Sequence, residues 1–156
     1  MDVRDGTHDT PRYVDKGIPL VTSKNLSDGH IDFSTVKLIS EADSIAINQR
    51  SKVDSGDIMY AMIGSIGNPV LYYGAEDFSI KNMALFKKIP CGMAMEYVYY
   101  FLVLAQDAMK KDASGGVQAF VSLSYLRNYL IPVPPLAEQQ RIVAKINEIL
   151  PTLTTL

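Results

Sequence analysis

The chain has 156 residues, of which 47% are hydrophobic and 21% are charged, and its formal net charge at pH 7 is −2. This length and composition suit one globular domain with its own core. One cysteine and two histidines exclude an internal disulfide and offer no spacing of metal ligands. No apolar run approaches the roughly 20 residues that cross a bilayer, and the N-terminus has no signal core, so we expect a soluble, cytoplasmic protein without a membrane partner.

The first third of the chain predicts a loop, a strand and a hairpin. Residues 5–11, DGTHDTP, are rich in turn-forming side chains and predict a loop. Strand-like IPLVTS follows at 18–23, and Asp28-Gly29 between two apolar runs predicts a tight turn. Residues 40–52 are weakly patterned, although the serine and glutamate that open them are placed like a helix start.

The middle of the chain alternates predicted strands with turns. The run DIMYAMI at 57–63 is apolar on both faces, as in a central strand that is buried on both sides, although its length alone does not exclude a helix. PVLYY at 69–73 and MALFKKI at 83–89 predict two more strands. Apolar residues then recur at helical spacing from 95 to 109, which predicts an amphipathic helix that ends at two lysines.

The last third predicts a short strand at 117–123, a short helix at 124–130, an extended IPVPP segment and a final helix that opens at Pro135. The apolar residues of this helix fit a heptad pattern, but Pro151 disfavours helix at Leu150, so about two heptads remain. Such a short helix must pack on something, either its own domain or a partner. The residues expected at a partner interface are Leu136, Gln139, Ile142, Val143, Ile146, Ile149 and Leu150.

The sequence carries no recognisable apparatus for catalysis. It lacks the glycine-rich cofactor loop and the Asn/Asp-Pro-Pro-Tyr motif of DNA methyltransferases, and it has no P-loop and no nucleophile elbow. Two carboxylate pairs, Asp54 with Asp57 and Glu76 with Asp77, stand at predicted turns, where solvated carboxylates are common. We therefore expect a chain that is not an enzyme.

Several predicted loops carry groups suited to nucleic acid. GSIGN at 64–68 is either a place where a phosphate backbone approaches free N–H groups or a tight turn only. Gly115-Gly116 with Gln118 is either a base-reading loop or a helix stop, and His8 is expected to hydrogen bond within its own loop. The net charge counts against binding by bulk electrostatics, but a domain can read bases while its partners neutralise phosphates.

Four segments, taken in order, resemble the specificity (S) subunits of type I restriction-modification systems. They are DGTHDTP at 5–11, GIPLVTSKNL at 17–26, GDIMYAMIGSIGN at 56–68 and SGGVQAFVSLSYLRNYLIPVPPLAEQQRIV at 114–143. The piece IPVPPLAEQQRIVAKI looks like the family's junction between a recognition domain and its spacer helix. The resemblance implies a mixed α/β fold, with a target recognition domain at 1–133 and a truncated spacer or assembly helix at 134–156.

The resemblance also implies a function, which is sequence-specific recognition of one half of a bipartite target in double-stranded DNA. A separate methyltransferase (M) subunit would use S-adenosylmethionine and a restriction (R) subunit would cleave, so this chain needs no cofactor. A full S subunit has two recognition domains and two spacer helices, so this chain is either a half-subunit that can form a homodimer through its last helix, or a fragment. The DNA-binding residues, chosen for side-chain chemistry in predicted loops, are Lys24, Asn25, Ser65, Lys81, Asn82, Lys110, Lys111 and Gln118.

An alternative function is an assembly module derived from a specificity subunit. Such a module would dimerise or dock through its last helix and would have little DNA binding of its own. The net charge of −2 favours this alternative.

Overall fold

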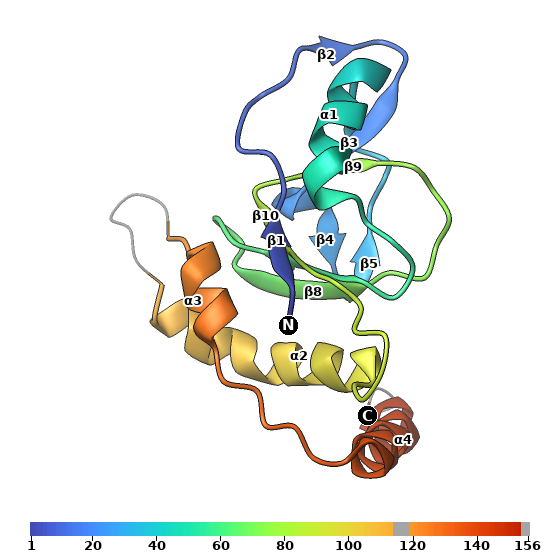
Figure 1. The fold of residues 1–156 in the computed structure, drawn as a ribbon, viewed down its shortest axis with the longest axis vertical. Coiled ribbons are helices and arrows are strands. Elements are labelled where there is room, and N and C mark those ends of the chain that lie inside the picture. Colours follow the sequence, from blue (N-terminus) through green and yellow to red (C-terminus); the bar gives the residue numbers. More distant parts are fainter. Residues whose placement is uncertain (114–118, 154–156) are drawn as a thin grey trace.

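The computed structural model describes residues 1–113 and 119–153 and shows a mixed α/β fold built on two four-stranded sheets (Figure 1). The central sheet is antiparallel, in the order β1 (Val3–Asp5), β10 (Met83–Phe86), β7 (Ile58–Ala61) and β8 (Gly67–Leu71). The second sheet has the order β2 (Tyr13–Val14), β6 (Lys37–Ile39), β3 (Ile18–Thr22) and β9 (Ser79–Lys81). In it, β3 and β9 run parallel, whereas the other pairs are antiparallel.

A small hairpin follows β3, as the sequence predicts. A 3-10 turn, η1 (Ser23–Asn25), leads into β4 (Leu26–Ser27), which pairs with β5 (His30–Ile31). The connecting residues Asp28 and Gly29 have φ values of 49° and 77°, the left-handed conformation that a tight two-residue hairpin turn requires. The predicted turn is therefore confirmed.

The central sheet is covered by an apolar cluster on each face. Successive side chains of a strand point to opposite sides and therefore enter different clusters. In β7, Ile58 and Tyr60 join the apolar cluster under α2 (Met95–Lys111) and α3 (Leu123–Asn128). Met59 and Ala61 join the cluster between the two sheets, and these four β7 side chains are fully buried. The prediction of a central strand within 57–63 is confirmed, as is the helix over 95–109.

Helix α1 (Glu41–Ser51) packs against β9 and β1 (Figure 1). It begins as predicted at Ser40, whose hydroxyl accepts a hydrogen bond from the backbone N–H of Asp43. Its inner face is polar, since the hydroxyl of the buried Ser44 lies 3.0 Å from that of Ser79 in β9. A polar inner face explains why the sequence shows so little apolar periodicity here.

Three predicted elements differ from the structure. Strand β10 ends at Phe86, so the predicted strand at 83–89 is too long. Within the predicted strand at 117–123, the described residues 119–122 make one isolated bridge, between Phe120 and Ile63, and Leu123 already belongs to α3. Helix α4 (Leu136–Leu153) continues through Pro151, where the missing N–H removes a single backbone hydrogen bond from the helix.

Candidate nucleic-acid interface

The loop after β1 lies against the connection between β9 and β10 and is fixed there by backbone hydrogen bonds. The N–H of Gly6 donates to the carbonyl of Met83 at 2.9 Å, and the N–H of Thr7 donates to that of Ile80 at 3.0 Å. In return, the N–H of Asn82 donates to the carbonyl of Thr7 at 3.0 Å. A Cβ atom on Gly6 would lie 2.5 Å from the carbonyl oxygen of Ile80, so only glycine fits this close approach.

This packing brings side chains from distant parts of the sequence together. His8 Nε2 lies 2.8 Å from Asp5 Oδ2, and His8 Nδ1 lies 3.1 Å from Asn82 Oδ1. The ammonium group of Lys81 hydrogen bonds to the hydroxyl of Thr10. The expectation that His8 hydrogen bonds within its loop is confirmed by its bond to Asp5.

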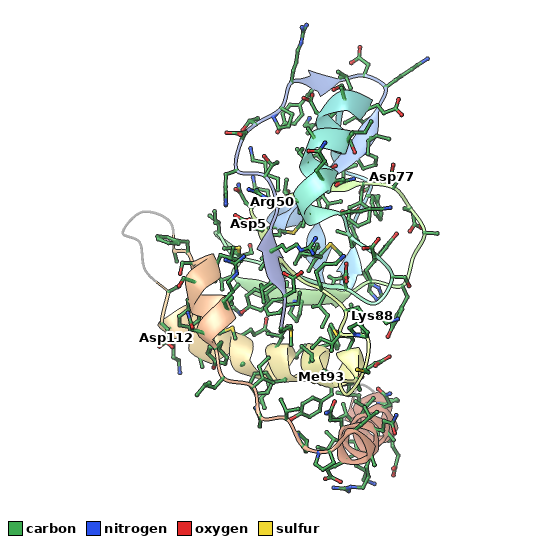
Figure 2. All side chains as sticks on the ribbon, in the orientation of Figure 1. Asp5, Arg50, Asp77, Lys88, Met93 and Asp112 are labelled. Atoms are coloured by element: carbon green, nitrogen blue, oxygen red, sulfur yellow. The ribbon has the colours of Figure 1, made fainter. Side chains whose placement is uncertain are left out.

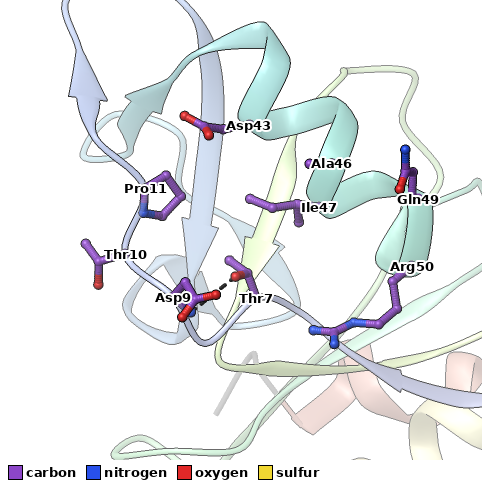
Figure 3. Close-up of a pocket in the computed structure, with 9 residues that line it drawn as sticks. All are labelled: Thr7, Asp9, Thr10, Pro11, Asp43, Ala46, Ile47, Gln49 and Arg50. Carbon is purple, nitrogen blue, oxygen red and sulfur yellow. Dashed lines mark hydrogen bonds between the residues drawn. The ribbon is translucent and has the colours of Figure 1, made fainter.

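Helix α1 contributes Arg50 to the same place. Its Nη2 donates to the carbonyl of Gly6 at 3.0 Å, and its Nε lies 3.6 Å from Asp5 Oδ1, while 58% of the side chain stays exposed. A cavity of about 490 Å³ separates the loop from α1 (Figure 3). Its lining residues are Thr7, Asp9, Thr10, Pro11, Asp43, Ala46, Ile47, Gln49 and Arg50.

We call His8, Thr10, Arg50, Lys81 and Asn82 the loop cluster. It presents two cations of the kind that bind phosphate beside a carboxamide of the kind that reads base edges. Two carboxylates stand beside it, Asp5 at the end of β1 and Asp9 in the loop that follows. The surface therefore offers hydrogen-bonding groups rather than a strong positive field, which agrees with the net charge of −2.

Of the other predicted DNA-binding residues, Lys24 lies in the 3-10 turn η1, directly after β3. It is exposed and follows Thr22, which pairs with Lys81 in the parallel ladder of β3 and β9. Lysines 110 and 111 are exposed in the last turn of α2, where positive charges stabilise the helix dipole. Figure 2 shows the next residue, Asp112, well away from Asp5 and Arg50. Gln118, with the glycine pair before it, lies outside the described residues.

Asn25 is a correction to the predicted set. Its side chain is buried, and its Oδ1 accepts hydrogen bonds from the backbone N–H and the hydroxyl of Thr22, both at 2.9 Å. Its Nδ2 donates to the carbonyl of Asp32 and to the hydroxyl of Thr35, both at 3.1 Å. All the usual hydrogen bonds of the carboxamide are therefore made within the domain, and Asn25 fixes the hairpin instead of facing DNA.

The GSIGN segment, residues 64–68, folds as a turn that is closed against the domain. The N–H of Gly64 donates to the carbonyl of Ala119, and the N–H of Asn68 donates to Gln106 Oε1, both at 3.1 Å. Because these donors are used internally, the structure favours the tight-turn interpretation over a phosphate site. The hydroxyl-bearing Ser65 remains exposed at the tip.

The first carboxylate pair has structural partners. The fully buried Asp57 accepts hydrogen bonds from the backbone N–H groups of Asp54 and Lys88, both at 2.8 Å, and from Lys87 Nζ at 2.5 Å. Lys87 Nζ also donates to Asp54 Oδ2 at 2.7 Å, and this hydrogen bond lowers the pKa of Asp54. Asp57 therefore ties the end of β10 to the start of β7.

In the second pair, Glu76 also has a structural partner. Glu76 accepts a hydrogen bond from the hydroxyl of Tyr72 at 2.7 Å, and burial together with this bond raises the pKa of Tyr72 to about 12.

Across residues 1–113 and 119–153, no three His, Cys, Asp or Glu side chains gather as metal ligands, and no helix is long and apolar enough to cross a membrane.

Helix α4 docks on its own domain through its first turns. Gln139 is fully buried, and its Oε1 accepts a hydrogen bond from the backbone N–H of Ala94 at 2.9 Å. Its Nε2 donates to the carbonyls of Pro134 at 2.8 Å and Gly92 at 3.2 Å. The heptad pattern places Gln139 at a partner interface, and this is wrong because its amide fastens α4 to the segment before α2.

The rest of α4 is less enclosed. The hydroxyl of Tyr100 in α2 hydrogen bonds to Asn147 Oδ1. The remaining expected partner residues divide into half-buried Ile142, Val143 and Ile146, and exposed Leu136, Ile149 and Leu150. A cavity of about 620 Å³ lies between α4 and the segment before α2. Its lining residues include Val143 and Asn147 of α4 and the exposed Cys91.

Comparison with known proteins gives the family. Residues 13–155 match the family model of the type I restriction modification DNA specificity domain. The MjaX protein of Methanocaldococcus jannaschii, named as a type I restriction enzyme specificity subunit, is 30% identical over 135 residues, which cover 81% of this chain and 31% of the relative. The EcoBI specificity subunit of Escherichia coli is 23% identical over 138 residues, which cover 85% and 28%. The chain thus spans about a third of the length of these relatives.

Solved structures share the fold over 99% of the chain. The HsdS subunit from Thermoanaerobacter tengcongensis superposes with a TM-score of 0.73 at 19% identity, over 36% of its own length. A chain from a study of the assembly and conformational transition of a type I restriction-modification system gives 0.74 at 20% identity, over 37% of its length. The S subunit from M. genitalium gives 0.62 at 18%, over 38% of its length. This chain belongs to the type I restriction modification DNA specificity domain family.

Proposed function

We propose that this chain recognises one half of a bipartite DNA target as the non-catalytic specificity component of a type I restriction-modification complex. The observation that carries the proposal is the match of residues 13–155 to the DNA specificity domain. The loop cluster supports a location for this contact, because Arg50 at the end of α1 is exposed and Lys81 and Asn82 at the end of β9 are half-buried.

In the proposed contact, Arg50 and Lys81 bind phosphates and position the domain, while Asn82 faces base edges. A domain with a net charge of −2 neutralises few phosphates. Its affinity for DNA therefore falls gently with salt, since the slope is about −0.9 per phosphate contact. Strong binding then needs a second recognition domain or the partner subunits.

The proposal includes the partners and the division of the chain. Residues 1–133 form the recognition domain, and residues 134–156 form an assembly helix that contacts a methyltransferase subunit and a second spacer helix. The apolar side chains of Leu136 and Ile149, which are 40% and 42% exposed, support a contact surface on α4. S-adenosylmethionine binds the methyltransferase subunit and DNA cleavage belongs to the restriction subunit, so the purified chain gives no calorimetric signal with this cofactor.

Selection from random-sequence duplexes tests the DNA-binding role. The purified chain, alone and with a methyltransferase subunit of a type I system, is expected to enrich one short contiguous motif, the half-target. Arg50→Ala with Lys81→Ala should abolish the enrichment, whereas Lys145→Ala, an exposed lysine on α4, should leave it unchanged. Failure of both forms of the protein to enrich any motif overturns the proposed function.

An assembly module is the second candidate, favoured by the exposed Ile149 and by the negative net charge. In this case the chain dimerises through α4 and binds DNA poorly. Light scattering should then show a dimer that Ile149→Lys converts to a monomer, because a charge would enter the apolar interface. Glu148→Lys, at the exposed neighbouring position, is the matched control, and circular dichroism monitors folding. A monomeric wild-type chain excludes the homodimer, and failure of this monomer to bind a methyltransferase subunit would exclude the assembly module as a whole.

A further inference from the structure

The ring of His8 lies between a carboxylate and a carboxamide. Nε2 is 2.8 Å from Asp5 Oδ2, and Nδ1 is 3.1 Å from Asn82 Oδ1. An ionised carboxylate only accepts hydrogen bonds, so Nε2 carries a proton in both charge states of the ring. The contact between Nδ1 and Asn82 is therefore the one that changes when the ring gains or loses a proton.

Two arrangements satisfy this contact. In the imidazolium form, Nδ1 donates a hydrogen bond and must face the oxygen of the Asn82 carboxamide. In the neutral form, Nδ1 accepts, and the carboxamide must turn by half a rotation so that Nδ2 faces the ring. The turn exchanges N and O without moving the backbone. The charge of His8 thus decides which end of the Asn82 amide points away from the ring.

The surroundings leave this outer end available. The backbone of Asn82 is held by its hydrogen bond to Thr7 and has a φ of 56°, a left-handed conformation that asparagine tolerates. The side chain is half-buried, and its Nδ2 hydrogen bonds to no residue within 1–113 or 119–153. A base edge can therefore meet the outer end directly.

Charged groups of both signs surround the ring. Asp5 approaches the ring from β1, and Nε of Arg50 in α1 lies 3.6 Å from the Asp5 carboxylate. Lys81, the last residue of β9, directly precedes Asn82. Asp9 follows His8 in the loop. The His8 side chain is 55% exposed, so solvent reaches the ring.

We propose that His8 is a positioning residue that sets the base preference of Asn82, an inference that rests on the proposed DNA-binding function. With His8 protonated, the outward Nδ2 donates and favours O6 of guanine and O4 of thymine over the amino groups that adenine and cytosine carry at the same position. With His8 neutral, the outward Oδ1 accepts and favours the donor groups of adenine and cytosine. Histidine changes charge between about pH 5 and pH 8, so the preference at one position of the half-target changes across that range.

The test is selection from random-sequence duplexes at the two ends of this pH range. For the wild-type chain, one position should move from guanine or thymine to adenine or cytosine by roughly tenfold as the pH rises. His8→Ala should bind DNA with the same preference at both ends, and Asn82→Gly should lose the preference at both. His30→Ala, at the other histidine, is exposed on β5 and should keep the change.

A second measurement needs no DNA. The side-chain amide signals of Asn82 in NMR spectra should shift across the same pH range in the wild-type chain and stay constant in His8→Ala. If they do so while no motif is selected, the control of Asn82 by His8 stands and the proposed function fails. A selected motif with no change in preference, a change that survives His8→Ala, or Asn82 signals that ignore pH in the wild type would each overturn the inference.

Discussion

Two carboxamides at distant places in the fold, Gln139 at the start of α4 and Asn82 in the loop cluster, are used in opposite ways. Gln139 is fully buried and makes three hydrogen bonds within the chain. Asn82 is half-buried, and its side chain contacts one ring nitrogen of His8. A saturated buried amide stabilises a fold, whereas an amide with an unused donor is available to a ligand. The same chemical group therefore holds the helix in one region and, in the other, keeps a donor that a ligand could use.

The largest expected effect is at the saturated amide. Gln139→Ala should lower the free energy of unfolding by about 3 kcal/mol, because the N–H of Ala94 and two carbonyls lose their partner. Urea unfolding followed by circular dichroism measures the loss. Gln140→Ala is the matched control, since this exposed neighbour should change stability by less than about 0.5 kcal/mol. Equal stabilities of the two variants would show that the docking of α4 does not depend on this amide.

The next effect compares two asparagines. Asn25→Ala should lower the free energy of unfolding by about 2 kcal/mol, because four hydrogen bonds inside the hairpin region are lost. Asn82→Gly, which keeps the positive φ, should cost less than about 1 kcal/mol. Thermal unfolding of both variants gives the difference. If Asn82→Gly proved the more damaging change, its side chain would belong to the folding core and not to a binding surface.

A smaller effect is expected at Lys81. Lys81→Ala should leave the free energy of unfolding unchanged and weaken binding to all duplexes alike, because a phosphate contact carries no sequence information. The slope of log affinity against log salt should become less steep by about 0.9. Titration of a labelled duplex at several salt concentrations measures it. Loss of preference at one base pair, with the slope unchanged, would assign Lys81 to base reading instead.

The smallest effect concerns Asp54, whose carboxylate forms an ion pair with Lys87. The hydrogen bond from Lys87 lowers the pKa of Asp54, so the unfolded chain takes up this proton more readily than the folded one. The stabilisation is present above the ordinary aspartate range and is lost as the pH falls through the lowered pKa. Stability should therefore fall less steeply below about pH 4 in Asp54→Asn than in the wild type. Since Asp54 is 57% exposed, solvent screening keeps the difference small.

Sequence patterns predict those elements whose stabilising contacts are made between residues close together in the chain. The spacing of Met95, Val98 and Leu102 predicts α2, and Asp28-Gly29 predicts the hairpin turn, because both depend on local geometry. The parallel pairing of β3 with β9 escapes prediction, since β9 is three residues long and its partner lies far away in the sequence. Short strands leave no periodicity to detect.

The candidate site is harder to predict for the same reason. Lys81 and Asn82 follow from side-chain chemistry, but nothing local marks Arg50, which reaches the carbonyl of Gly6 from 44 positions away. Asn25 looks like Asn82 in the sequence, and its burial arises from contacts with Asp32 and Thr35. Tertiary packing decides which polar side chain keeps a hydrogen-bonding group that is available to a ligand.

The single cysteine of the chain gives the α4 junction an experimental use. Cys91 is exposed and lines the same cavity as Val143 and Asn147 of α4. A thiol-reactive fluorophore attached there would sit against the helix without any engineered residue. Its emission should change when α4 leaves the domain or contacts another protein. The natural sequence therefore supplies an attachment site for a fluorescent label that reports on contacts of α4.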